Sequence, residues 1–180
     1  MPTPPRLRRR RALRIGTAII VVGLIGVISA RMHILRTVRI ESEQISAPLS
    51  AQEFSILKLV NDERARAGLP ALQFSPHLMA AARTHSRDMA AHHYFAQRGA
   101  AGDSPASRIH AAGLTYRAVA ENIYTEQGKN LDSLPQRAVT GWLRSGPRRA
   151  NLLSPVSRLS AVGIARSSDG TTYVTEDFID

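Results

Sequence analysis

The side chain best suited to acid–base chemistry is the carboxylate of Glu121. It lies in a strand-like run over residues 119–124, and a carboxylate can act as a general acid or base. A hydrolase built on a carboxylate pair would need a second acid nearby, and Glu126 and Glu176 are the available ones. The residue types therefore allow a metal-independent hydrolase with Glu121 as its catalytic residue.

Thiol and serine chemistry have little support. The chain has no cysteine, which excludes thiol catalysis, cysteine-linked haem and cysteine-based zinc sites. No serine lies in a Gly-x-Ser-x-Gly turn, and no histidine follows His110. The motifs therefore argue against a Ser-His-Asp hydrolase, although such a triad is ultimately defined by geometry.

Basic charge is concentrated at the N-terminus. Residues 1–40 hold nine arginines and no acid, whereas the other 15 basic residues accompany 14 acids in residues 41–180. A domain that binds nucleic acid normally carries its own basic stripe. We therefore expect no nucleic-acid partner.

An uncharged segment rich in Ile, Val and Leu follows this basic tail. Its 16 residues, 15–30, fall between a signal-peptide core of roughly 7–15 residues and a spanning helix of about 17–25. Arginines on its N-terminal side predict that the N-terminus stays cytoplasmic. We expect an anchor in the inner membrane, with a cleaved signal as the alternative. The predicted organisation is a cytoplasmic tail over 1–14, the anchor over 15–30, a linker over 31–49 and an extracytoplasmic domain over 50–180.

Cap signals predict that this domain begins with helices. Ser50 and Glu53 form a capping box, and Gly68 ends the helix that follows. Its inward face is expected to carry Phe54, Leu57 and Val60. Serine–proline pairs at 75–76 and 104–105 open two further helices. The inward face of the first of these carries Leu78, Ala82, His85 and Met89.

Strand signals appear later in the chain. The run over 119–124 predicts one strand, and a fourth helix is expected over about 134–143. Residues 161–164 and 173–178 flank a turn at Ser168-Asp169-Gly170, a pattern typical of a hairpin. Helices followed by interspersed strands favour an α+β or layered αβα domain.

Short sequence blocks recur in an order that resembles a known family. They are Leu59-Val60-Asn61, Asp88-Met89, Tyr94-Phe95, Ser104-Pro105, Glu121-Asn122-Ile123, Trp142, Ser145 and Asn151-Leu152-Leu153. Over about residues 53–180 the chain resembles the bacterial, SCP-like branch of the CAP family, named for cysteine-rich secretory proteins, antigen 5 and plant pathogenesis-related protein 1. The resemblance implies a three-layer αβα sandwich with a surface cleft, usually in secreted or envelope proteins.

The cleft of this family typically carries histidines and glutamates that can hold a divalent metal, and this chain departs from that pattern. Gln97 stands where relatives often have histidine, and Pro147-Arg148 replaces a Gly-His pair. An amide is a poor zinc ligand and a guanidinium is none. We therefore expect no metal and no cofactor, and hypothesise that Arg148 pairs with Glu121 in the metal's place.

The remaining polar residues have competing interpretations. His92 and His93 are adjacent and could form a relocated metal site, but one is expected to pack and the other to face water. His85 is expected to be a satisfied core histidine, and Asn122 a structural residue that ties down a loop. Arg149 and Asn151 are expected to brace the cleft wall as a hydrogen-bonded pair.

These observations together favour a membrane-anchored extracytoplasmic domain that acts by binding. The predicted binding cleft comprises Gln97, Glu121, Asn122, Arg148, Arg149 and Asn151. Its arginine would favour an anionic ligand from the envelope, such as a lipid, a glycan strand or a partner protein. The alternatives are the Glu121 hydrolase and a degenerate family member with a structural role.

Overall fold

The structure is a computed structural model, and it describes residues 48–180. Predictions for the tail, the hydrophobic segment and most of the linker lie outside the described residues. Within residues 48–180, no helix is long and apolar enough to cross a membrane.

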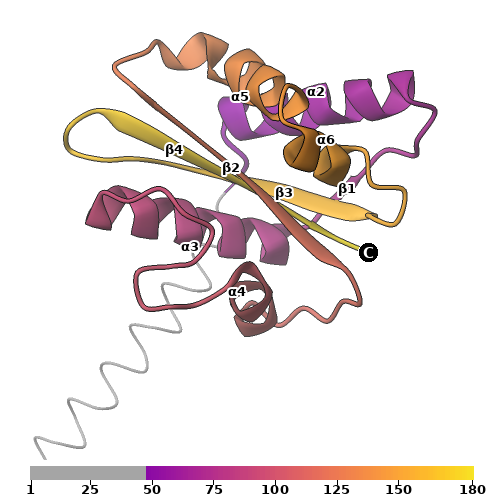
Figure 1. The fold of residues 1–180 in the computed structure, drawn as a ribbon, viewed down its shortest axis with the longest axis horizontal. Helices are drawn as coiled ribbons and strands as arrows, with labels where there is room; N and C mark the ends of the chain where they lie inside the picture. The colour runs from indigo at the N-terminus through magenta and orange to yellow at the C-terminus, as the bar shows by residue number, and fades with distance from the viewer. Residues whose placement is uncertain (1–47) are drawn as a thin grey trace, which may run out of the picture. The chain divides into compact units, whose positions relative to one another are not determined.

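A four-stranded sheet forms the centre of the domain (Figure 1). Its strands are β1 (Gln73–Phe74), β2 (Val119–Gln127), β3 (Leu159–Arg166) and β4 (Thr171–Ile179), in the order β1-β3-β4-β2. β4 is antiparallel to both of its neighbours, and β1 runs parallel to β3. The expected hairpin is confirmed as β3 and β4, with Gly170 supplying the positive φ of 83° in its turn.

Helices cover both faces of the sheet, which confirms the layered αβα architecture (Figure 1). One face packs against α2 (Ala51–Arg66), α5 (Leu134–Leu143) and α6 (Gly146–Leu152). The other packs against α3 (Pro76–His92) and α4 (Pro105–Ala111). A short 3₁₀ turn, η1 (Leu131–Ser133), leads into α5.

The predicted caps determine where the helices begin. The Ser50–Glu53 capping box is present, and Ser75 and Ser104 cap α3 and α4. Phe54 is the exception: it is 56% exposed, and Ile56 lies inward in its place beside Leu57 and Val60. Glu53 takes the inward place in the first turn, and position 54 is rotated away from the face that positions 53, 57 and 60 share.

The apolar core lies on both faces of the sheet. The larger cluster, between the sheet and α2, α5 and α6, includes Trp142, Leu152 and Phe178, all fully buried. A second cluster joins Leu78, Met79 and Ile109 beneath α3 and α4. α3 lies so close to β3 that a Cβ on Gly163 would fall 2.2 Å from the backbone nitrogen of Arg83. The sheet and its two helical layers thus fix the positions of the residues on β2 and β4.

Candidate functional site

Glu121 points from β2 toward α3 and α4, and its side chain is fully buried. Its partner is Arg108 of α4, whose Nη2 donates to Oε2 at 2.6 Å. The same guanidinium donates to the Asp103 carboxylate at 2.7 Å and to the Gln97 carbonyl at 2.9 Å. Only 6% of the Arg108 side chain is exposed, so its contact with Glu121 is closed off from solvent, whereas Asp103 remains partly exposed.

A second carboxylate lies directly across the ladder from Glu121. Asp177 of β4 is its register partner and is fully buried. Within residues 48–180, the single guanidinium of Arg108 thus faces three carboxylates, those of Asp103, Glu121 and Asp177. Two buried like charges on neighbouring strands repel each other, which favours the neutral form of each carboxyl.

The protonation of this pair follows from its burial. Burial raises the pKa of Glu121 to about 7, against the lowering effect of Arg108. Burial, reinforced by the Glu121 charge, raises the pKa of Asp177 well above its ordinary value. Oε1 of Glu121 and both carboxylate oxygens of Asp177 are buried without a hydrogen-bond partner within residues 48–180. Burial therefore favours the neutral form of each carboxyl.

His85 of α3 completes this buried cluster. Its side chain is fully buried, with Nε2 2.9 Å from the Ala96 carbonyl and 3.8 Å from Oε1 of Glu121. Burial, with the charge of Arg108, lowers the pKa of His85 to about 4. The imidazole is therefore neutral at pH 7 and lies in the core as expected. It is not fully satisfied, because its Nδ1 has no hydrogen-bond partner within residues 48–180.

Most of the predicted cleft residues meet at the Glu121–Asn122 peptide. Gln97 and Asn151 both donate to the Glu121 carbonyl, at 2.8 and 3.3 Å. Asn151 also donates to the Asn122 side chain at 2.9 Å. Asn122 in turn donates to the Arg148 carbonyl at 2.9 Å, which ties α6 to β2 as a structural asparagine would.

The partner predicted for Glu121 was wrong. Glu121 pairs with Arg108, not with Arg148. Neighbouring residues of a strand point to opposite faces, so Glu121 faces α3 and α4 while Asn122 faces α6. Arg148 meets this region through its backbone carbonyl on the Asn122 side.

Two further predictions need correction. Asn151 bonds to Asn122 and Glu121 rather than to Arg149. Glu176, considered as the second acid beside Glu121, lies opposite Asn122 in the ladder and hence on the other face. There Ser160 donates to it at 2.9 Å, and burial raises its pKa to about 8 against the opposing charge of Arg64. Asp177 holds the position that had been considered for Glu176.

A divalent cation does not fit the residues around Glu121. Arg108 already occupies one carboxylate oxygen, and its charge would repel a cation. His92 and His93 are both exposed and lie against Asp88 and Asp169, respectively, so neither packs inward. Within residues 48–180, no group of three or more His, Asp or Glu side chains is arranged to hold a metal.

The order of blocks, the layered fold and the Glu121–Asn122 strand agree with a comparison against protein families. A model described as CAP, the cysteine-rich secretory protein family, matches residues 57–178. The chain belongs to the CAP family. This confirms the resemblance inferred from the sequence.

Two bacterial relatives are longer than the region that this chain matches. The chain is 32% identical over 136 residues to the uncharacterized protein YkwD of Bacillus subtilis (strain 168), covering 74% of this chain and 50% of that protein. The chain thus spans half the length of that relative. It also resembles an extracellular SCP-domain protein of Bacillus anthracis, with 26% identity and a TM-score of 0.62 over 74% of this chain and 45% of the other.

A structure from another bacterium shares the fold alone. An outer surface protein of Borrelia burgdorferi has 15% identity and a TM-score of 0.64, covering 74% of this chain and 96% of that one. The CAP fold is therefore retained at low sequence identity. Fold likeness of this kind carries no assignment of activity.

Proposed function

We propose that the chain is a membrane-anchored, extracytoplasmic CAP-domain protein that acts by binding an anionic component of the cell envelope. The location is supported by the basic tail and hydrophobic segment at residues 1–30 and by the extracellular relative from Bacillus anthracis. The membrane is the partner of the N-terminal segment, and the domain faces outward.

The burial of Glu121 is the observation that supports a binding role. Its side chain has no exposed area, and its Oε2 already accepts a hydrogen bond from Arg108. A catalytic acid or base must come within hydrogen-bond reach of the substrate proton. The closed network around Glu121 therefore favours binding over hydrolysis.

The anionic ligand is inferred from the basic surface around α6. α6 carries Arg148 and Arg149, and Arg144 precedes it at the end of α5. Arg149 is exposed and Arg148 half-buried, and within residues 48–180 neither side chain forms an ion pair. A guanidinium without a partner suits a carboxylate or phosphate of a lipid, a glycan strand or a partner protein.

Co-sedimentation of the full chain with isolated peptidoglycan and with anionic lipid vesicles tests this proposal. Arg148→Ala and Arg149→Ala should each weaken binding to one of these materials, because each removes a charge from the α6 surface. Arg158→Ala, which removes an exposed charge at the start of β3, is the matched control. Equal binding by all three variants would refute recognition through α6.

The same preparation separates binding from hydrolysis. Glu121→Gln should leave binding intact, because the buried carboxylate does not touch the ligand in this proposal. Release of soluble fragments by the unaltered chain but not by Glu121→Gln would instead establish the hydrolase.

A further inference from the structure

The two edges of the sheet differ in whether side chains cover their outward backbone groups. At the β2 edge, the outward carbonyls of Glu121 and Ile123 accept bonds from Gln97, Asn151 and Trp142. Side chains thus close that edge against further strands. Closure of this kind prevents an edge strand from pairing with another chain.

The β3 edge is not closed in this way within residues 48–180. β1 pairs only with Leu159 and Ser160, and β3 continues to Arg166. The carbonyls of Arg158 and Ser160 accept bonds from Gln73 and Ser75 on that side. Because backbone groups alternate in direction along a strand, those of Val162, Ile164 and Arg166 also point outward there.

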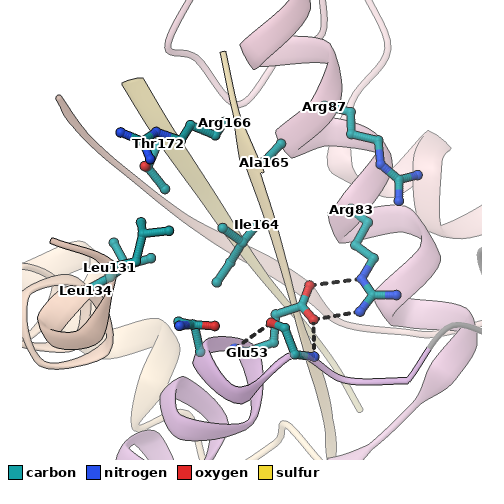
Figure 2. Close-up of a pocket in the computed structure, with 11 residues that line it drawn as sticks. Glu53, Arg83, Arg87, Leu131, Leu134, Ile164, Ala165, Arg166 and Thr172 are labelled. Atoms are coloured by element: carbon teal, nitrogen blue, oxygen red, sulfur yellow. Dashed lines mark hydrogen bonds and ion pairs between the residues drawn. The ribbon is translucent and has the colours of Figure 1, made fainter. Parts of the chain in front are cut away.

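A pocket lies beside this open stretch. Its volume is about 490 Å³, within the range of ligand sites. Ile164, Ala165 and Arg166 contribute the strand side, while Leu131 and Leu134 add apolar surface. Figure 2 shows Arg83 and Arg87 of α3 on one side of the pocket and Arg166 with Thr172 on the other.

The charge of this pocket is positive. Arg83, Arg87 and Arg166 line it together with a single acid, Glu53. Arg83 binds both oxygens of Glu53, at 2.9 and 2.6 Å (Figure 2). Since Glu53 is committed to Arg83, two positive charges remain to meet a ligand.

We propose that this pocket binds an extended acidic peptide segment, which adds to the outer edge of β3 as a fifth strand. Backbone bonds to Ile164 and Arg166 would provide affinity. Acidic side chains on the face of the peptide toward α3 would reach Arg87, and apolar side chains on the other face would meet Leu131 and Leu134. Residues 161–166 would accommodate about six peptide residues. This site shares no residue with the α6 surface, so the inference is independent of the proposed function.

Fluorescence polarisation with the full chain and blocked hexapeptides of alternating Glu and Val tests the charge requirement. The Glu-Val peptide should bind, and its Lys-Val counterpart should not. Arg87→Glu should weaken the Glu-Val peptide about tenfold or more, as expected for loss of a charged hydrogen bond. Arg87 is exposed, so its reversal should leave the fold intact, and Arg158→Glu is the matched control.

N-methylation of the peptide tests strand addition without altering the protein. In an added strand, alternate peptide N–H groups point toward β3 and the others point away. Methylating one alternate set should therefore abolish binding, whereas methylating the other should not. The proposal would be overturned if both methylated sets bound equally well, if the Lys-Val peptide bound as well as the Glu-Val peptide, or if Arg87→Glu had no effect. It would also be overturned if no binding were seen at about 5 mM peptide, since a dissociation constant above that value is weaker than typical for a specific contact.

Discussion

Replacing Glu121 by glutamine should remove a pH dependence from the stability of the domain. The folded pKa of Glu121 is about 7, against an ordinary value of 4.5. Below pH 4.5 the folded and unfolded chains both hold this proton. Between 4.5 and 7 only the folded chain retains it, so the free energy of unfolding falls as the pH rises.

The size of the effect follows from the same shift. From the shift between 4.5 and about 7 in the pKa of Glu121, a full titration corresponds to about 3 kcal/mol. Glutamine keeps the shape of the side chain and can still accept from Arg108, but it does not titrate. The stability of Glu121→Gln relative to the unaltered chain should therefore rise by about 3 kcal/mol across this window and stay level above it.

Urea unfolding of the full chain at a series of pH values measures this difference. Trp142 is the only tryptophan of the chain, is fully buried and donates to the Ile123 carbonyl at 3.0 Å, so its fluorescence reports on this strand. Glu126→Gln is the control, because its hydrogen bond to Arg137 lowers the pKa of Glu126 and its difference should be flat above about pH 5. A constant difference for Glu121→Gln would refute a raised pKa at that residue.

Two further predictions concern packing and metal binding. Gly163→Ala should destabilise the domain by about 1–3 kcal/mol or more, because the added Cβ would lie 2.2 Å from the backbone of Arg83. Gly146→Ala is the control, because a Cβ there would have nothing within 4 Å. Equal thermal stability of the two variants would contradict this packing. Zinc should not raise the melting temperature of the full chain, since Arg108 occupies the Glu121 carboxylate; a saturable rise would show that a tight site exists.

Local signals in the sequence were sufficient to predict most helices and strands. Serine caps followed by proline or glutamate fixed three helix starts, because those side chains satisfy backbone groups within the same turn. The sequence analysis missed β1 and α6. β1 has only two residues, both exposed, and α6 begins with Gly146-Pro147, without a side-chain cap bond. Such elements depend on tertiary contacts that short patterns do not encode.

The candidate site was only partly predictable. Gln97, Asn122 and Asn151 were identified and do converge on the Glu121 backbone. The partner of Glu121 was missed because Arg108 lies on α4. That helix covers the opposite face of the sheet from α6, where the predicted partner Arg148 lies. The Ser104-Pro105 cap begins the short helix α4, whose last turn carries Arg108, and this is the signal that could have suggested it.

The second buried acid depended on strand parity. Glu176 and Asp177 are adjacent in β4, so one must face α3 and α4 while the other faces α2, α5 and α6. The pairing of Glu121 with Asp177 places Asp177 on the face toward α3 and α4. A shift of one residue in register would put Glu176 there instead. The sequence places both acids in one strand but does not contain that register. Since Asp177 and Glu121 are register partners on one face, Arg108 meets two buried acids there rather than one, and no local pattern in the sequence indicates that pairing.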